Sequence, residues 1–412
     1  MADGPAAQPR LEARRVFLLG ALTLGHSAIH WYQQLFPVIL PAIKTSMGLN
    51  DVQVGGLSTA REAVGGLLML PAGFLADSFA KHRPLILAFA LACGGLAYFL
   101  VGLAPSYIWA LPAIGLVGVA SAAWHPASVG SLSSRFPERR GTALAVHGVG
   151  ASVGDTVGPV CVGALLVVIG WRRLLELHLI PALLLALVLW KSLGPIYTEE
   201  GPGPNLRSYL SGVKGMLRQR SVIAIMVASS LMNMGRISVL TFLPIYLTED
   251  LGYSSFALGF FVMLLHLMGM VSQPVMGIVS DRFGRKAVLL PAFTALGLLY
   301  LVVPAAGAGI QLGLVIGAIG LFFYGTGNIA TAAVMDVSAA GVQGTTMSVM
   351  SVFRQIFTIP SPVIAGYIVT VFGAKASFYY DSALLLLGAL VLLAVPTPRH
   401  SAVPRTEPPG RN

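Results

Sequence analysis

The stretch Trp124–Gly163, WHPASVGSLSSRFPERRGTALAVHGVGASVGDTVGPVCVG, contains the features that decide the fold. An apolar run leads into a basic turn at Arg135–Arg140, and a glycine-rich run that holds His147 and Asp155 follows the turn. Glycines spaced four residues apart allow a second helix to approach closely inside a membrane. We interpret the stretch as two membrane helices joined by a cytoplasmic turn.

The same pattern returns in the second part of the chain, in Gly344–Gly366, GTTMSVMSVFRQIFTIPSPVIAG. Three positions recur at a constant offset of 203 residues, so that Gly344, Pro362 and Gly366 correspond to Gly141, Pro159 and Gly163. The segment Met47–Gly55 likewise matches Leu251–Gly259 at an offset of 204 residues. Parallel repetition of a six-helix half is known from transporters whose substrate site lies between the halves. The chain is therefore predicted to contain two copies of one unit.

The composition excludes a soluble globular protein. Of the 412 residues, 56% are hydrophobic and 10% are charged, whereas soluble domains carry about 25% charged residues. Apolar segments long enough to cross a hydrocarbon core of about 30 Å recur along the whole chain. Because lipid offers no hydrogen-bond partner to the backbone, these segments should be helices, which predicts an all-α membrane protein. Twelve transmembrane helices are expected, at residues 16–43, 52–76, 84–104, 107–133, 141–170, 173–193, 221–247, 254–279, 287–306, 310–337, 344–372 and 376–396.

The net charge of +10 is distributed as in a membrane protein rather than as in a nucleic-acid-binding protein. Most of the 26 lysines and arginines lie in the N-terminus, in alternate loops and in the C-terminus. Because basic loops remain on the cytoplasmic side, both termini are predicted to be cytoplasmic. The apolar segment after the basic N-terminus is too long for a signal peptide, so we expect an uncleaved, multi-pass protein of the bacterial inner membrane.

The two copies define the expected domains. A stretch rich in Gly, Pro and charged residues separates the sixth and seventh apolar segments and reads as a linker. We predict two pseudo-symmetric six-helix bundles that function as a monomer in the lipid bilayer. The parts are a cytoplasmic N-terminal segment 1–15, an N-terminal bundle 16–193, a cytoplasmic linker 194–220, a C-terminal bundle 221–396, and a cytoplasmic disordered tail 397–412.

Two equivalent loops are predicted to stabilise a gate that closes the cytoplasmic side. The loop GIVSDRFGRK at Gly277–Lys286 places an aspartate among arginines, which allows charge-assisted hydrogen bonds. The first-half copy, GFLADSFAKHR at Gly73–Arg83, has Ser78 and Ala80 where the second copy has Arg and Gly. The predicted gating residues are Gly73, Asp77, Lys81, Gly277, Asp281, Arg282, Gly284 and Arg285.

The loop at Gly277–Lys286 resembles the G-x-x-x-D-R-x-G-R-[RK] pattern of the major facilitator superfamily. The resemblance implies that family's fold and a transport function. Gly154, Gly158 and Pro159 resemble the antiporter pattern of the same superfamily, with Val162 in place of one of its glycines. The runs HSAIHWYQQLFPVILP, AWHPAS and MNMGRISVLTFLPIYL together resemble the fosmidomycin resistance protein group within it. That group has an acidic residue at the position of His30, so no proton role is carried over to this residue.

Polar residues inside apolar spans are costly, and each is therefore a functional candidate. His26, His30 and Gln33 share one helix face, and Arg236 needs an anionic partner, either a carboxylate of the protein or a substrate. No metal is expected, because two imidazoles at helical spacing are an incomplete ligand set. The predicted substrate-binding residues are His26, His30, Gln33, His125, Asn233, Arg236, Asn328 and Gln355.

Three groups inside the N-terminal half are candidates for proton coupling: Asp155, Glu62 and His147. A carboxylate surrounded by apolar groups holds a proton more readily than one in water, and histidine titrates near neutral pH. Arg61 and Glu62 are adjacent, about 100° apart around a helix, so we expect one to face the cavity and the other a neighbouring helix.

These features predict a secondary transporter working by alternating access, and neither an enzyme nor a cofactor-dependent protein. The charged groups favour a small anionic or zwitterionic organic substrate. The resemblance to the antiporter pattern implies that this compound is exported in exchange for protons. Two alternatives remain open at this point. One is uptake of an organic anion by proton symport, and the other is a non-transporting membrane receptor or a channel.

Overall fold

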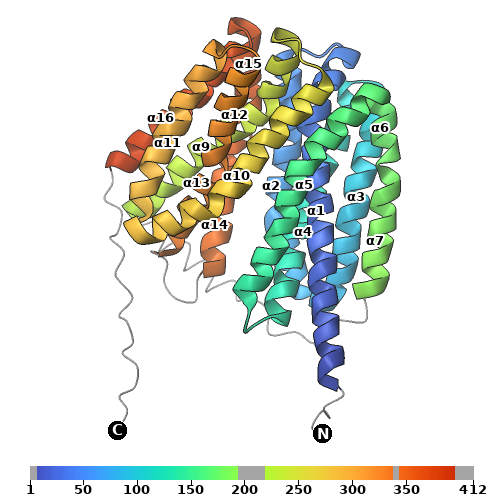
Figure 1. Ribbon diagram of the computed structural model, residues 1–412. Coiled ribbons are helices and arrows are strands. Elements are labelled where there is room, and N and C mark those ends of the chain that lie inside the picture. Colours follow the sequence, from blue (N-terminus) through green and yellow to red (C-terminus); the bar gives the residue numbers. More distant parts are fainter. Residues whose placement is uncertain (1–6, 194–218, 337–342, 395–412) are drawn as a thin grey trace, which may run out of the picture.

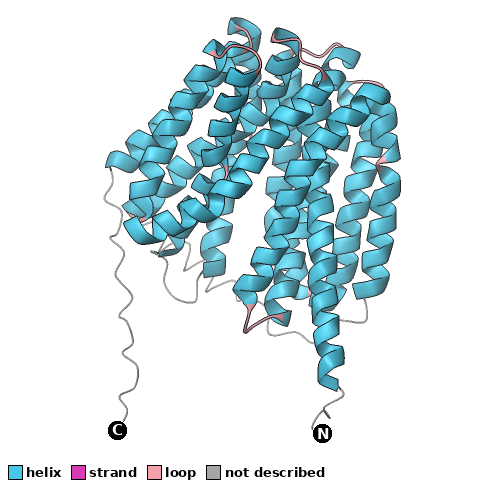
Figure 2. Ribbon diagram, in the orientation of Figure 1, coloured by secondary structure: helices cyan, strands magenta, loops and turns pink. Residues whose placement is uncertain are grey.

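The computed structural model describes residues 7–193, 219–336 and 343–394, and in these residues the chain is helical with no strand (Figures 1 and 2). The predicted linker 194–220, except for its last two residues, and the predicted tail 397–412 lie outside the described residues. The first part of the predicted N-terminal segment 1–15 lies outside them as well, and helix begins at Ala7.

Six membrane-length helical segments form the N-terminal half (Figure 1). Helix α1 packs along α5, α2 along α4, and α3 against α4 and α7. The elements are α1 (Ala7–Met47), α2 (Asp51–Ser78), η1 (Ala80–His82), α3 (Arg83–Leu103), α4 (Tyr107–Arg135), α5 (Arg140–Val168), α6 (Trp171–Leu177) and α7 (Leu179–Leu193), the last two forming one segment interrupted at His178.

The C-terminal half contains six further segments. Helix α16 packs against α9 and α11, and α10 packs against α12. The elements are α9 (Arg220–Ile245) with a π-helical end η3 (Tyr246–Asp250), α10 (Ser255–Phe283), α11 (Arg285–Val302) with η4 (Val303–Ala305), α12 (Ile310–Phe323) with α13 (Gly325–Asp336), α14 (Gln343–Thr358) with α15 (Ser361–Phe372), and α16 (Lys375–Ala394).

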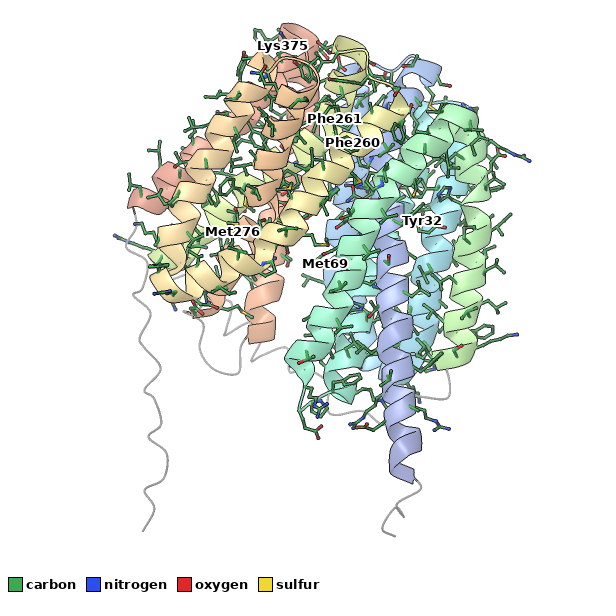
Figure 3. All side chains as sticks on the ribbon, viewed as in Figure 1. Tyr32, Met69, Phe260, Phe261, Met276 and Lys375 are labelled. Atoms are coloured by element: carbon green, nitrogen blue, oxygen red, sulfur yellow. The ribbon has the colours of Figure 1, made fainter. Side chains whose placement is uncertain are left out.

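The twelve segments confirm the predicted membrane fold. Ten of the described helical segments are long and apolar enough to cross a membrane. The other two, α1 and α2, are long enough, but polar residues such as His26, His30 and Arg61 lower their hydropathy. Large apolar side chains such as Leu184 and Val188 of α7 are exposed, which suits contact with lipid rather than water. Side chains project outward along the length of α7 (Figure 3).

The equivalent helices α2 and α10 begin in the same way. Asn50 accepts a hydrogen bond from the Gln53 backbone N–H at 2.9 Å, and Gln53 Oε1 accepts one from the Asn50 N–H at 3.0 Å. Ser254, which is equivalent to Asn50, accepts from the Ala257 backbone N–H at 3.3 Å. Such caps satisfy backbone donors that the first helical turn leaves free. The sequence match at offset 204 therefore marks two structurally equivalent helix starts.

The two halves contact each other at the helix ends that lie away from the termini (Figure 1). Helix α2 packs along α15, and α5 packs along α10. Lys44 connects the halves at this end, because its Nζ lies 2.6 Å from Asp51 Oδ1 and 2.6 Å from Glu249 Oε2. Toward the termini the two bundles diverge (Figure 1).

Candidate functional site

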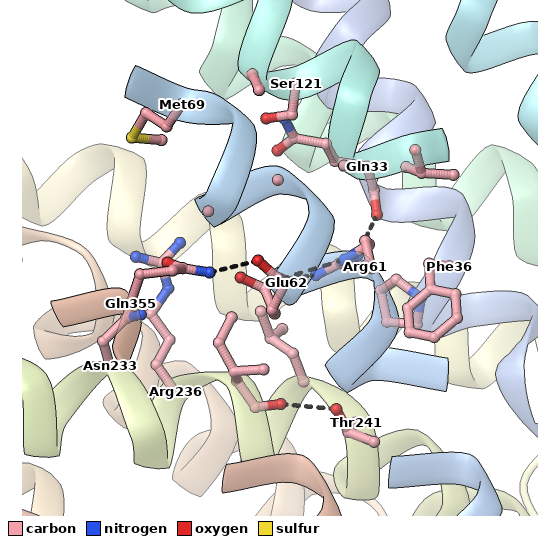
Figure 4. A pocket seen from close by; sticks show the side chains of 18 of the residues that line it. Gln33, Phe36, Arg61, Glu62, Met69, Ser121, Asn233, Arg236, Thr241 and Gln355 are labelled. Atoms are coloured by element: carbon pink, nitrogen blue, oxygen red, sulfur yellow. Dashed lines mark hydrogen bonds and ion pairs between the residues drawn. The ribbon is translucent and has the colours of Figure 1, made fainter. Parts of the chain in front are cut away.

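A cavity of about 350 Å³ lies between the two halves (Figure 4). Helices α1, α2 and α4 form its wall on the N-terminal side, and α9 and α14 form its wall on the C-terminal side. On the closed side of the cavity, Ser58 and Thr241 form a hydrogen bond of 2.9 Å across the halves. The polar residues in its lining are His30, Gln33, Gln34, Arg61, Glu62, Ser121, His125, Asn233, Arg236, Thr241, Arg354 and Gln355.

The structure brings most of the predicted substrate-binding residues to this cavity. His30, Gln33, His125, Asn233, Arg236 and Gln355 all lie in its lining. Two others do not. The ring of His26 is buried and stacks on His147 at a centroid distance of 3.9 Å. Asn328 is exposed on α13, where its Nδ2 donates to Gln273 Oε1 at 2.9 Å.

Arg61 and Glu62 both line the cavity and pair with each other, which differs from the expectation that they would point apart. Arg61 Nη2 lies 2.9 Å from Glu62 Oε1, and Arg61 Nε lies 3.3 Å from the same oxygen (Figure 4). The guanidinium also stands 5.0 Å from the Phe36 ring centroid. Both side chains are long enough to bridge the angle between adjacent helical positions, and opposite charges attract strongly where water is scarce.

Two further arginines enter the cavity from the C-terminal half. Arg236 of α9 lies 4.5 Å above the Tyr324 ring centroid, and its Nε is buried without a hydrogen-bond partner. Arg354 of α14 lies within electrostatic range of Arg236 and Glu62. Within the described part of the chain, neither arginine forms an ion pair with a carboxylate. The C-terminal wall therefore presents uncompensated positive charge, which attracts anions.

A chain of hydrogen bonds beside the cavity connects the two halves. Asp155 Oδ2 accepts from His30 Nδ1 at 3.0 Å, and Asp155 Oδ1 accepts from Gln34 Nε2 at 2.7 Å. The Oε1 of Gln34 then accepts from Nε2 of His266, on α10, at 3.0 Å. The Tyr324 hydroxyl completes the chain by donating to His266 Nδ1 at 2.6 Å. Each acceptor in this arrangement has one donor.

The sequence analysis did not identify Gln34, His266 or Tyr324. A signal for His266 was present, since it is the only histidine between residues 221 and 396 and lies within an apolar segment. Gln34 is adjacent to the predicted Gln33 but points to a different neighbour. No sequence signal identifies Tyr324, because buried tyrosines are common wherever the hydroxyl finds a partner.

The predicted gating residues lie at the diverging ends of the two bundles. Arg285 donates to Asp281, to Ser280 at 3.0 Å and to Asp336 at 2.8 Å, which connects α10, α11 and α13. In the N-terminal half, Arg83 Nη2 lies 3.3 Å from Asp77. The aspartate of each copy thus pairs with an arginine of its own half.

The remaining gating residues are Gly73, Gly277, Gly284, Arg282 and Lys81. A Cβ placed on Gly73 or Gly277 would meet no described atom within 4 Å. Gly284 has φ +94°, which a glycine adopts without strain, and it separates α10 from α11. The Arg282 guanidinium lies 5.4 Å from the Phe283 ring centroid. The side chain of Lys81 is exposed.

The family model described as Major Facilitator Superfamily matches residues 17–362 and 270–411. The chain belongs to this superfamily. It is 26% identical over 395 residues to a Bacillus subtilis (strain 168) protein named "Probable galactarate/D-glucarate transporter GudP", which covers 86% of this chain and 84% of the relative. It is also 26% identical over 309 residues to the fosmidomycin resistance protein of Escherichia coli (strain K12), covering 73% of this chain and 74% of that protein.

A solved structure supports the fold assignment. A bacterial homologue of the human lysosomal transporter Spinster, in an inward-facing and unoccupied conformation, superposes with a TM-score of 0.77. The match covers 92% of this chain and 96% of that chain at 16% sequence identity. This major facilitator superfamily member is therefore a multi-pass membrane transporter and not an enzyme.

Proposed function

We propose that this superfamily member exports a small zwitterionic or anionic organic compound from the bacterial cytoplasm in exchange for protons. The observation that carries the proposal is the composition of the cavity between the halves. Arg236 and Arg354 lie on one wall, while the Arg61–Glu62 pair lies on the opposite wall. Substrate binding between the two bundles is the arrangement that alternating access requires.

The C-terminal wall suits the anionic group of the substrate. A guanidinium is permanently charged and presents several donors in a plane that matches a carboxylate or phosphonate. The side chains of Asn233 and Gln355 add amide groups on the same side of the cavity. An anion bound here would lower the repulsion between the nearby charges of Arg236 and Arg354.

Glu62 is the group that we assign to proton exchange. It faces the cavity, where water from the open side can reach it, whereas Asp155 and His147, the other two predicted candidates, do not line the cavity. A carboxylate that holds a proton cannot also bind the ammonium group of a zwitterion. Proton and substrate then exclude each other at Glu62, and such exclusion produces exchange rather than cotransport.

The contacts between the halves close one end of the cavity and leave the other end open. With cytoplasmic termini, the closed ends at Lys44 and Glu249 face outward and the diverging ends face the cytoplasm. The opposite state would bring the cytoplasmic ends together near Gly73 and Gly277, where this state leaves space. The Asp77–Arg83 and Asp281–Arg285 pairs lie at those ends and would then contribute the gate contacts.

Proton symport of an organic anion is the second candidate, and the same ion pair supports it. A proton on Glu62 would release Arg61, whose charge could then hold an anion beside the protonated acid. In that case proton and substrate would bind together rather than in turn. The two candidates therefore differ in whether the proton on Glu62 excludes the substrate or binds together with it.

Transport by the purified full-length chain in proteoliposomes tests the proposal. A thermal-shift screen of amino acids, betaines, phosphonates and dicarboxylates first selects ligands, and a pH gradient is then imposed in each direction. Exchange predicts that substrate accumulates on the acidic side, whereas symport predicts accumulation on the alkaline side. Counterflow of labelled against unlabelled substrate distinguishes a carrier from a channel or a receptor. Accumulation on the alkaline side, or absence of counterflow for every selected ligand, would overturn the exchange assignment.

A further inference from the structure

Four histidine rings of the N-terminal half gather beside the cavity. His26 and His30 come from α1, His125 from α4 and His147 from α5. The ring centroids of His26 and His30 lie 4.7 Å apart, and His125 lies 5.5 Å from His26 and 5.8 Å from His30. One ligand nitrogen from each of these three rings lies within 4.8 Å of the others. The transport role proposed above uses none of this cluster as a unit.

The hydrogen bonds of the three rings set the position of their protons. Nδ1 of His26 faces the His147 carbonyl oxygen at 2.9 Å, and Nδ1 of His125 faces the Ser121 carbonyl oxygen at 2.8 Å. Nδ1 of His30 faces Asp155 Oδ2 at 3.0 Å. All three partners are acceptors, so each neutral ring carries its proton on Nδ1 and leaves a lone pair on Nε2.

Two of the three Nε2 lone pairs lack a hydrogen-bond partner in the described structure. Nε2 of His26 and Nε2 of His30 are both buried without a hydrogen-bond partner. His26 as a residue is only 8% exposed. A buried polar atom without a partner destabilises the folded protein, so a ligand that these nitrogens could bind would remove that cost.

We propose that His26, His30 and His125 form a binding site for a divalent transition metal ion, with Zn²⁺ as the representative case. Three imidazole nitrogens with one open position are a common zinc ligand set. Zinc–nitrogen bonds of about 2.0–2.1 Å place tetrahedral ligands about 3.3 Å apart, and one nitrogen from each ring already lies within 4.8 Å of the others. His30 and His125 line the cavity, so the site is next to the space proposed for the transported compound.

The surroundings match those of metal-binding histidines. A ligating imidazole normally donates its other N–H to a carboxylate or a carbonyl oxygen, and all three rings do so here. The Asp155 carboxylate lies behind His30 and adds the negative charge that a bound cation needs. Neutral nitrogen ligands disfavour Mg²⁺ and Ca²⁺, which prefer oxygen. The site thus gives Asp155 a positioning role that is independent of proton exchange at Glu62.

Metal binding to the full-length protein tests the site directly. The protein is purified with a tag that contains no histidine, stripped with a chelator and titrated with ZnCl₂ by calorimetry. Co²⁺ serves as a second probe, because its visible absorption distinguishes tetrahedral from octahedral coordination. One equivalent of Zn²⁺ per chain, a rise in melting temperature and a tetrahedral Co²⁺ spectrum are the expected results.

Variants identify the ligands. His30→Gln and His125→Gln should each lower Zn²⁺ affinity by more than the about 10–100-fold that loss of an outer partner costs, and Asp155→Asn should fall within that range. His178→Gln is the matched control, since His178 is also buried in this half but lies outside the cluster. His82→Gln controls for an exposed histidine. Melting temperatures without metal show whether each variant is folded.

The proposal is overturned if the wild-type protein binds no Zn²⁺, or if His30→Gln and His125→Gln both bind it as tightly as His178→Gln does. The result does not depend on the transport proposal, because binding is measured without a gradient or an organic substrate. Zn²⁺ entry into proteoliposomes then distinguishes a transported ion from a resident one. A transported ion and a resident ion would both bind to His26, His30 and His125.

Discussion

The carbonyl oxygen of Pro362 on α15 lies 2.2 Å from the point where a Cβ on Gly55 of α2 would stand. The equivalent pair in the repeat has the same geometry, since a Cβ on Gly259 would stand 2.3 Å from the Pro159 carbonyl oxygen. Real Cβ atoms essentially never approach an atom so closely. Glycine at these two positions therefore allows the halves to close at the ends away from the termini.

Gly55→Ala and Gly259→Ala are expected to open this end. The backbone oxygen opposite each glycine cannot move aside as a side chain could, and overpacking of this kind costs about 1–3 kcal/mol. That energy shifts the population toward the state open on this side. Labelling of a cysteine placed at Ser58, which is buried in the closed state, should accelerate by about 5–150-fold.

Gly20→Ala is the control for this prediction, because a Cβ on Gly20 meets no described atom within 4 Å. Its labelling rate should equal that of the parent protein. Equal rates in Gly55→Ala and Gly20→Ala would contradict the assigned closing contact.

Arg236→Ala is expected to weaken binding of an anionic or zwitterionic substrate by about 10–100-fold. The reason is that the variant loses one charge-assisted hydrogen bond, which contributes about 1.5–3 kcal/mol. Arg354→Ala should act in the same direction. Equilibrium binding by scintillation proximity with the labelled substrate measures both. Arg173→Ala, which removes an exposed arginine outside the cavity lining, should bind normally. Normal affinity in Arg236→Ala would contradict the anion-binding role.

Glu62→Gln is expected to separate exchange from proton coupling. The amide cannot release a proton and binds an ammonium group less tightly than a carboxylate does. Accumulation driven by a pH gradient should therefore cease, while counterflow should continue at higher substrate concentrations. Parallel assays of the two activities in the same proteoliposomes measure the difference. Asp155→Asn should retain gradient-driven accumulation, because Asp155 does not line the cavity. The reverse pattern would move proton exchange from Glu62 to Asp155.

The Gln34–His266 bond is expected to couple the halves energetically. Each single alanine substitution leaves a buried partner unsatisfied at about 1–3 kcal/mol, while the double substitution removes both ends at once. The double-mutant cycle should therefore show a coupling of about 0.5–3 kcal/mol in chemical unfolding of the detergent-solubilised protein. Strict additivity would show that the hydrogen bond contributes nothing.

Much of the candidate site could be anticipated from helix periodicity. His30 and Gln33 were predicted to share a cavity-facing stripe on α1, and Arg236 was predicted to need an anion or a carboxylate. The cavity contains all three. His26 lies on the same helix face but does not line the cavity, because His147 of α5 covers its ring. Periodicity gives the direction of a side chain but not the neighbour that covers it.

The sequence by itself determined the membrane spans, the repeat and the family. Lipid forces every span into a helix, so the apolar segments predict the helices, and the glycines and prolines at offsets 203 and 204 mark equivalent positions. Only the tertiary structure decided which polar groups meet. His125 joins His26 and His30, and His266 reaches Gln34, because helix rotation and crossing bring together residues that are distant in sequence. Those angles depend on the packing of all neighbouring side chains at once. The spacing of residues within one helix does not determine them.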